Sequence, residues 1–147
     1  MNTKVMFSSA NEVWATPQDF FDKLNDEFNF DLDPCALVEN AKCPVFFTPE
    51  EDGLKQSWEG YTVFCNPPYG RAIAAWVKKC YEESRKPNTT VVMLIPARTD
   101  TAYFHDYIYH KADDIRFLRA RLKFGGSNNS APFPSMVVVF NPKHKQL

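Results

Sequence analysis

YTVFCNPPYGRAIAAWVKKCYEESRKPNTTVVMLIP, residues 61–96, carries the clearest structural pattern of the chain. Residues 61–65 are apolar and strand-like, and residues 90–95 form an uninterrupted apolar run typical of a central parallel strand. Between them, apolar residues of the segment 71–85 recur at helical spacing: Ile73, Trp76, Val77 and Cys80. The stretch predicts a strand, helix, strand unit with Asn66-Pro67-Pro68-Tyr69 directly after the first strand.

A helix is expected near the start of the chain. Thr16 and Pro17 are its predicted N-cap and first position, and Asp19 stands at the capping-box position. Its apolar stripe consists of Phe20, Phe21, Leu24 and Phe28.

The remaining segments continue the alternation of strands and helices. Strands are expected at residues 30–33 and 45–48, a helix at 102–109, and a final pair of strands at 115–124 and 135–140. This order predicts an α/β fold with a single open, doubly wound, mostly parallel sheet and an antiparallel C-terminal strand pair. Ligands of such sheets bind at the carboxyl ends of the strands.

Length and composition fit one domain over residues 1–147. With 44% hydrophobic and 15% aromatic residues, the chain can bury roughly two-thirds of its unfolded surface without disulfides or metal. No apolar run reaches the roughly 18 residues of a membrane span, and the N-terminus lacks a signal core, so we expect a cytoplasmic protein. Scattered cysteines predict reduced, mostly buried thiols: Cys35, Cys43, Cys65 and Cys80.

Charge is distributed unevenly along the chain. Residues 1–66 hold 4 basic and 12 acidic side chains, whereas residues 67–147 hold 13 and 6. A basic surface suits phosphate and an acidic one suits a cationic small molecule, so the asymmetry hints at two ligands of opposite sign. Ordinary solvated surface charge explains the same counts.

The motif Asn66-Pro67-Pro68-Tyr69 suits a planar base that carries an amino group. The Asn66 side-chain oxygen and the Pro67 carbonyl can accept the two amino hydrogens, which favours the pyramidal geometry that develops during attack. The Tyr69 ring can stack on a base pulled out of the duplex, and the prolines stiffen the loop. A rigid strand-ending turn would use the same residue types.

Two acidic positions could hold a cofactor. Asp33, in Asp33-Pro34-Cys35-Ala36 at the end of a strand, could meet the ammonium of a methionine-like group, and Asp52 lies about where nucleotide-binding sheets place an acid that grips ribose hydroxyls. A loop aspartate and a simple acidic turn are the alternatives.

Several motifs together resemble the phage-type, Dam-like DNA N6-adenine methyltransferases. They are, in chain order, WATP (14–17), DLDPCA (31–36), EDGL (51–54), CNPPYGR (65–71), PARTDT (96–101), RLKFGG (121–126) and APFPS (131–135). The resemblance implies the class I S-adenosylmethionine-dependent methyltransferase fold and methylation of adenine in DNA. It implies the catalytic motif Asn66, Pro67, Pro68 and Tyr69, and the cofactor residues Trp14, Thr16, Pro17, Asp33, Pro34, Ala36 and Asp52.

The chain departs from broader DNA methyltransferases in three ways. No glycine-rich turn follows the first strand, so the cofactor loop must be built differently. Only some 12 residues separate Pro49 from Tyr61, which predicts a sheet abbreviated at one edge. We expect no separate target-recognition domain, and therefore DNA contacts from short loops.

The basic half supplies the candidates for DNA contact: Arg98, Arg119, Arg121, Lys123, Ser127 and Asn128. For Arg116 we favour an ordinary edge-strand charge. The three histidines, His105, His110 and His144, lack a metal-like partner set, and we expect no metal.

Other activities fit the same residues. The motif suits any planar amino or amide nitrogen, so RNA bases and a protein glutamine amide are alternative substrates. A non-catalytic DNA-binding module on the same fold is the alternative from another class, because the cofactor loop lacks its glycines.

Overall fold

The computed structural model describes residues 14–126 and 130–142. At its centre, β3 (Thr62–Cys65) and β4 (Thr90–Pro96) pair in parallel, from Thr62 opposite Thr90 to Cys65 opposite Met93. Helix α3 (Ile73–Ser84) connects them. The predicted strand, helix, strand unit is confirmed.

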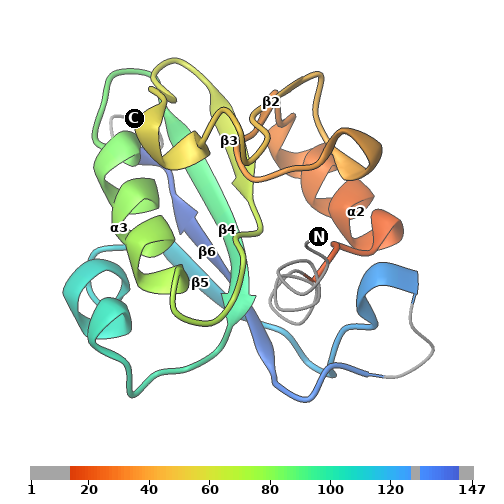
Figure 1. Cartoon of the computed structure of the whole chain (residues 1–147). Coiled ribbons are helices and arrows are strands. Elements are labelled where there is room, and N and C mark those ends of the chain that lie inside the picture. Colours follow the sequence, from red (N-terminus) through yellow and green to blue (C-terminus); the bar gives the residue numbers. More distant parts are fainter. Residues whose placement is uncertain (1–13, 127–129, 143–147) are drawn as a thin grey trace.

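Six strands form one sheet in the order β2-β1-β3-β4-β6-β5 (Figure 1). The short strands β1 (Leu32–Asp33) and β2 (Val45–Phe46) continue the parallel part beyond β3. On the other side, β6 (Ser135–Phe140) runs antiparallel to both β4 and β5 (Asp114–Phe117). A mixed α/β fold with an antiparallel C-terminal pair is therefore confirmed.

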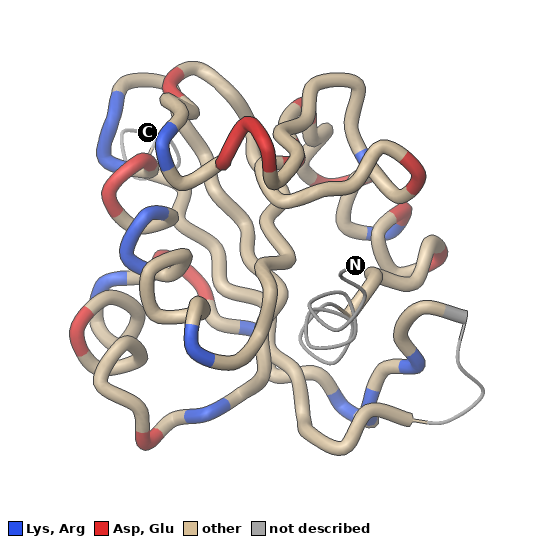
Figure 2. Tube along the Cα trace, in the orientation of Figure 1, with Lys and Arg blue, Asp and Glu red and all other residues tan. Residues whose placement is uncertain are grey.

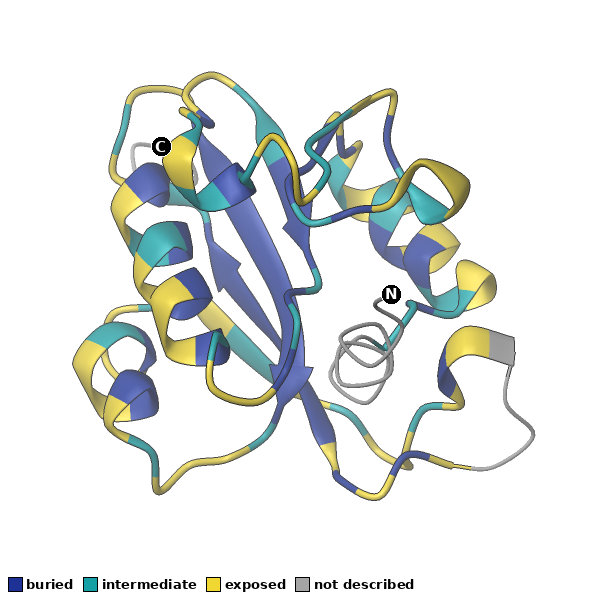
Figure 3. Cartoon of the chain, in the orientation of Figure 1, coloured by how far each residue is buried: buried dark blue, intermediate teal, exposed yellow. Residues whose placement is uncertain are grey.

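The two long helices lie on opposite faces of the sheet. Phe64 of β3 contacts Phe21 of α2 (Gln18–Phe28), with the ring centroids 5.1 Å apart. The next residue, Cys65, lies close enough to Cys80 of α3 for the two thiols to interact. Successive side chains of a strand point to opposite faces, so α2 covers one face and α3 the other. Figure 3 shows the strands as the most buried part of the molecule.

Helix α2 starts one residue later than its sequence suggests, and the capping box is wrong. Pro17 is its N-cap, and no side chain caps the helix. The Thr16 hydroxyl accepts a hydrogen bond from Asn66 instead. The hydroxyl that the local sequence predicted as a helix cap is thus hydrogen-bonded to a residue far away in the sequence.

The predicted strand 115–124 is too long. β5 ends at Phe117, and the Leu118 N–H donates to the carbonyl of Ser135, which is the first residue of β6. Beyond Leu118 the segment has no partner strand, and Ala120 adopts a positive φ of 63° that breaks the pleat. Residues 118–123 are a loop.

Short helical turns complete the described chain. They are η1 (Val38–Asn40), η2 (Gly53–Lys55), the π-helical turn η3 (Phe104–Ile108) and η4 (Phe124–Gly126). η3 lies within the helix expected at 102–109. All four cysteines are free thiols, three of them buried, as expected. No helix in the described ranges is long and apolar enough to cross a bilayer.

Candidate active site

The carboxyl ends of three neighbouring parallel strands carry the predicted functional motifs. Asp33 is the last residue of β1, Asn66 follows β3, and Arg98 follows β4 by two residues. Because β1, β3 and β4 are adjacent in the sheet, these residues come together at one edge of it.

Asn66 is held on both ends of its side-chain amide. The Nδ2 group donates to the backbone carbonyl of Trp14 and to the hydroxyl of Thr16, 2.9 Å away. Its Oδ1 atom accepts from the hydroxyl of Tyr69 at 2.7 Å. The N-terminal segment and the motif after β3 are therefore joined through one side chain.

The buried side chain of Tyr69 forms one wall of the site. Its hydroxyl also lies 3.1 Å from the carbonyl of Leu94, and burial raises its pKa well above the usual range. Its ring contacts Phe133 edge-on, with centroids 5.6 Å apart. The hydroxyl therefore stays protonated and acts as a donor at neutral pH.

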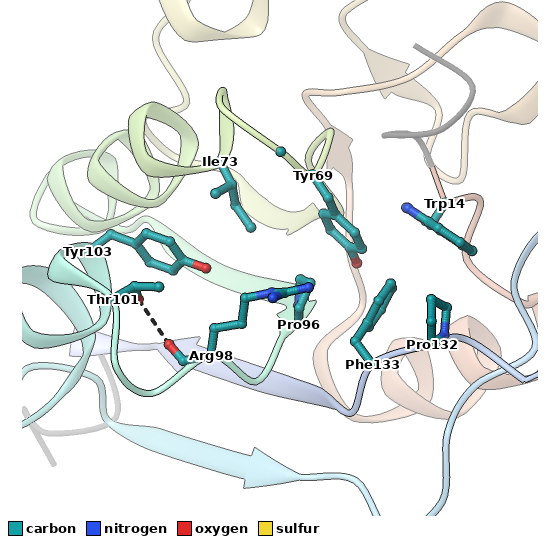
Figure 4. Close-up of a pocket in the computed structure, with 10 residues that line it drawn as sticks. Trp14, Tyr69, Ile73, Pro96, Arg98, Thr101, Tyr103, Pro132 and Phe133 are labelled. Atoms are coloured by element: carbon teal, nitrogen blue, oxygen red, sulfur yellow. Dashed lines mark hydrogen bonds between the residues drawn. The ribbon is translucent and has the colours of Figure 1, made fainter. Parts of the chain in front are cut away.

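A cavity of about 490 Å³ opens beside Tyr69 (Figure 4). Aromatic rings dominate its wall, which consists of Trp14, Tyr69, Gly70, Ile73, Pro96, Arg98, Thr101, Tyr103, Pro132 and Phe133. Arg98 extends across it toward Tyr69 and Pro96, while its carbonyl accepts from the Thr101 hydroxyl at 2.9 Å. Flat apolar walls with one cationic group suit a planar ring attached to an anionic group. We call it the aromatic cavity.

Two further cavities lie on the other side of the motif and share Cys35. The larger, of about 330 Å³, is lined by Pro34, Cys35, Ala36, Phe47, Thr48, Pro49, Asp52, Gly53, Leu54, Pro68 and Trp76. The smaller, of about 30 Å³, is lined by Trp14, Ala15, Thr16, Asp33, Cys35, Asn40, Lys42, Phe64 and Asn66. Six of the seven predicted cofactor residues line one or the other. Pro17 lines neither, since it stands at the start of α2.

Asp33 is the charged group of the smaller cavity. Its side chain is almost fully buried and accepts from the backbone N–H groups of Cys35 and Lys42, at 3.3 and 3.0 Å. Burial outweighs these bonds and raises the pKa of the carboxyl to about 6. A buried carboxylate in this state favours a cationic ligand, which would lower its pKa again.

Comparison with known proteins identifies the family. A model of the family DNA N-6-adenine-methyltransferase (Dam) matches residues 3–146 of the chain. The chain belongs to this family. DNA N-6-adenine-methyltransferase of Haemophilus phage HP1 (strain HP1c1) is 33% identical over 149 residues, which cover 97% of this chain and 84% of the phage protein. DNA N-6-adenine-methyltransferase of Escherichia phage T1 is 33% identical over 109 residues, which cover 73% of this chain and 45% of that protein.

Membership of the Dam family confirms the predicted class of enzyme, an adenine-specific DNA methyltransferase, and with it the resemblance seen in the sequence. The individual site residues remain predictions, because neither relative assigns a role to a position of this chain. Three of the four motif residues line the cavities described above: Asn66, Pro68 and Tyr69. Pro67 is buried between them.

Sequence reasoning missed how this Dam-family chain builds, without glycines, the loop after β1 that is predicted to hold the cofactor. Gly53, in the neighbouring loop, lies directly against the backbone of Pro34, so that a Cβ atom on Gly53 would overlap the carbonyl oxygen of Pro34. The carbonyl of Gly53 accepts from the indole of the fully buried Trp58 at 3.0 Å, and the backbone N–H of Trp58 donates to Glu83 at 2.6 Å. The glycine of EDGL was the only local sign of this contact.

The predicted DNA-binding residues fall into three groups. Arg98 lines the aromatic cavity. Arg119, Arg121 and Lys123 are exposed in the loop between β5 and η4, and they have no ion pair within the described ranges. Figure 2 shows basic positions along this part of the chain. Ser127 and Asn128 lie outside the described residues.

Arg116 is structural, as favoured from the sequence. Its guanidinium forms two hydrogen bonds of 2.7 Å to the Glu27 carboxylate and one of 2.8 Å to Asp114. This bidentate pair ties the edge strand β5 to α2. No group of three or more His, Cys, Asp or Glu residues that could hold a metal ion occurs in the described part of the chain.

Proposed function

We propose that this Dam-family protein transfers a methyl group from S-adenosylmethionine to the N6 amino group of adenine in DNA, with Asn66-Pro67-Pro68-Tyr69 between the two ligands. One observation carries the proposal. The same motif lines three cavities. Asn66 lines the cavity of about 30 Å³ together with Asp33, and Pro68 lines the cavity of about 330 Å³ together with Asp52. Tyr69 lines the aromatic cavity. A motif shared by a carboxylate-lined side and an aromatic side suits a reaction between a cationic cofactor and a planar base.

The two cavities that share Cys35 fit S-adenosylmethionine. Asp33 would hold the ammonium of the methionine part, because its carboxyl is buried in this cavity and burial raises its pKa by more than two backbone N–H groups and the charge of Lys42 lower it. Asp52 would bind the ribose hydroxyls, and Pro34 and Ala36 would line the path between them. When bound, the sulfonium of this cofactor supplies an electrophilic methyl group.

The aromatic cavity fits an adenine that is flipped out of the DNA. Tyr69 and Phe133 would bury the faces or edges of the base, while the Asn66 oxygen and the Pro67 carbonyl accept the two amino hydrogens. Holding both hydrogens turns the nitrogen lone pair out of conjugation with the ring. The product amine is acidic while it is cationic, so its proton can leave without a dedicated base.

DNA contact would come from Arg98 and the basic loop residues Arg119, Arg121 and Lys123, together with Ser127 and Asn128. Arg98 is suited to a phosphate of the flipped nucleotide, and the exposed cations of the loop to the neighbouring backbone. Action on DNA supports a cytoplasmic location in a bacterium or a phage-infected host cell. We also propose that the chain forms a single domain with the class I methyltransferase fold, and that its sheet is doubly wound and abbreviated at the β2 edge.

The test is transfer of tritiated methyl groups from labelled S-adenosylmethionine to adenine-containing DNA. Wild-type protein should label DNA, and Asn66→Ala should lose about a hundredfold or more in rate, as losses of a single well-placed polar group do. Normal labelling by Asn66→Ala would contradict the proposed role of the motif.

Competition between DNA, RNA and protein tests the substrate. Labelled RNA or a labelled glutamine amide would replace the proposal with one of those activities. Calorimetry with S-adenosylmethionine tests the non-catalytic alternative, because no heat of binding at millimolar cofactor would favour a DNA-binding module.

A further inference from the structure

The two ends of the Asn66 amide face chemically different partners. The Trp14 carbonyl has no hydrogen to donate, so the atom that faces it must be the donor Nδ2. Thr16 accepts from the same nitrogen at 2.9 Å. The oxygen Oδ1 must then point to the other side, where the Tyr69 hydroxyl donates to it. The partners alone therefore set the orientation of the amide.

We infer that Thr16 is a positioning residue: the Trp14 carbonyl sets which end of the Asn66 amide is the nitrogen, the Thr16 hydroxyl holds that nitrogen in place, and Thr16 does not act as a ligand of the cofactor. The inference rests on the proposed function, in which Oδ1 must accept a hydrogen from the adenine amino group. Tyr69 uses one of the two lone pairs of Oδ1, which leaves one for the substrate. If the Asn66 amide were flipped, its NH2 group would face the adenine amino group. Both groups are donors, so Asn66 could not hold the amino group.

Thr16 is well placed for this role because its segment is fixed by the protein itself. The threonine is almost fully buried, with 6% of its surface exposed. The carbonyl of the preceding residue, Ala15, accepts a hydrogen bond from the backbone N–H of Gly125 at 2.9 Å. The Trp14 ring packs edge-on against Phe124 and Phe133, at centroid distances of 5.7 and 5.2 Å. The hydroxyl therefore has its position before any ligand binds.

The experiment compares Thr16→Val, which removes the acceptor at nearly constant volume, with Thr16→Ser, which keeps it. Thr16→Val should lower kcat about tenfold, the effect of one lost hydrogen bond of ordinary strength. The Kd for S-adenosylmethionine and the KM for DNA should change less than about twofold, and Thr16→Ser should restore kcat. Thr62→Val is the matched control, because its hydroxyl on β3 has no partner within the described ranges.

Two results would overturn the inference. One is a weaker Kd for S-adenosylmethionine with an unchanged kcat in Thr16→Val, which would make Thr16 a cofactor ligand after all. The other is an equal loss of kcat in Thr16→Ser or in Thr62→Val, since neither removes the acceptor that faces Asn66.

Thermal unfolding without ligands separates this inference from the proposed function. Thr16→Val should lower the Tm by a few degrees when Asn66 is present and leave it nearly unchanged in an Asn66→Ala background. Equal shifts in both backgrounds would show that the two residues are not coupled. Absence of DNA methylation by the wild-type protein would contradict the proposed function and leave this measurement intact.

Discussion

The buried carboxyl of Asp33 lowers the free energy of unfolding at neutral pH. Burial raises the pKa of its carboxyl from 3.8 to about 6. The folded protein therefore binds this proton more tightly than the unfolded chain does. The contribution of Asp33 to the free energy of unfolding is most favourable below about pH 4 and is lost as the pH rises through about 6. At neutral pH the loss amounts to about 3 kcal/mol.

Asp33→Asn should consequently stabilise the ligand-free protein at pH 8 by about 1–2 kcal/mol, because the amide keeps an acceptor but loses the buried charge. The gain should disappear below about pH 4. Urea unfolding at both pH values measures it, with the exposed Asp26→Asn on α2 as the control.

The same variant should weaken binding of S-adenosylmethionine by tenfold or more, measured by calorimetry, because the partner of the ammonium is gone. A variant that is less stable at pH 8 and binds the cofactor normally would contradict both parts of this prediction.

At the scale of elements, the predicted cofactor loop depends on contact between two segments that follow different strands. Gly53, at the start of η2, lies against the Pro34 carbonyl after β1. Trp58 holds the carbonyl of Gly53, and Glu83 of α3 holds the backbone of Trp58. The contact is thereby fixed by α3, which also packs directly against η2 through Trp76.

Gly53→Ala should separate these segments, because the new Cβ would overlap the Pro34 carbonyl. We expect a loss of about 1–3 kcal/mol in unfolding free energy and a weaker affinity for S-adenosylmethionine. Gly60→Ala is the matched control. Its Cβ would have no neighbour within 4 Å, and its cost comes only from a φ of +86°. If both variants bind the cofactor equally well, the Gly53 contact does not shape the site.

The loop between β5 and η4 is the element expected to bind the DNA backbone. The double variant Arg119→Gln/Arg121→Gln should weaken DNA binding across all sequences, and the slope of log K against log salt should become shallower by about two. Fluorescence anisotropy with labelled duplexes at several salt concentrations measures both.

Arg116→Gln is the control for this loop, since its charge is already paired with Glu27. It should leave the salt slope unchanged and cost about 1 kcal/mol or less in stability. An equal change of slope in Arg116→Gln would point to a general effect of net charge.

At the scale of the whole molecule, the sequence predicted the elements well because their signals are local. Apolar periodicity located α2, α3, β3 and β4, and turn residues located the motif after β3. The end of β5 was wrong, because it depends on where its partner β6 begins, which alternation within one strand does not reveal.

Most residues that line the three cavities around the motif lie within segments that could be named from the sequence, but their arrangement could not be predicted. Asn66 and Trp14 are 52 positions apart in the sequence, and no spacing rule links such a pair. Thr16 carried an N-cap pattern that its contact with Asn66 overrides. The charge asymmetry was a better guide. The acidic half contributes Asp33 and Asp52 to the proposed cofactor cavities, and the basic half contributes Arg98 and the exposed loop.

Trp14 belongs to both the aromatic cavity and the smaller cavity of Asp33. Because one indole forms a wall of both cavities, we expect a ligand in one cavity to change the contacts that the ring offers in the other, and such a linkage between two affinities is reciprocal. Calorimetry should show S-adenosylmethionine binding about fivefold or more tightly when DNA is present, and Trp14→Leu should reduce this ratio. Equal ratios in both proteins would contradict the linkage. An enzyme with this linkage would hold its cofactor more tightly during encounters with DNA than between them.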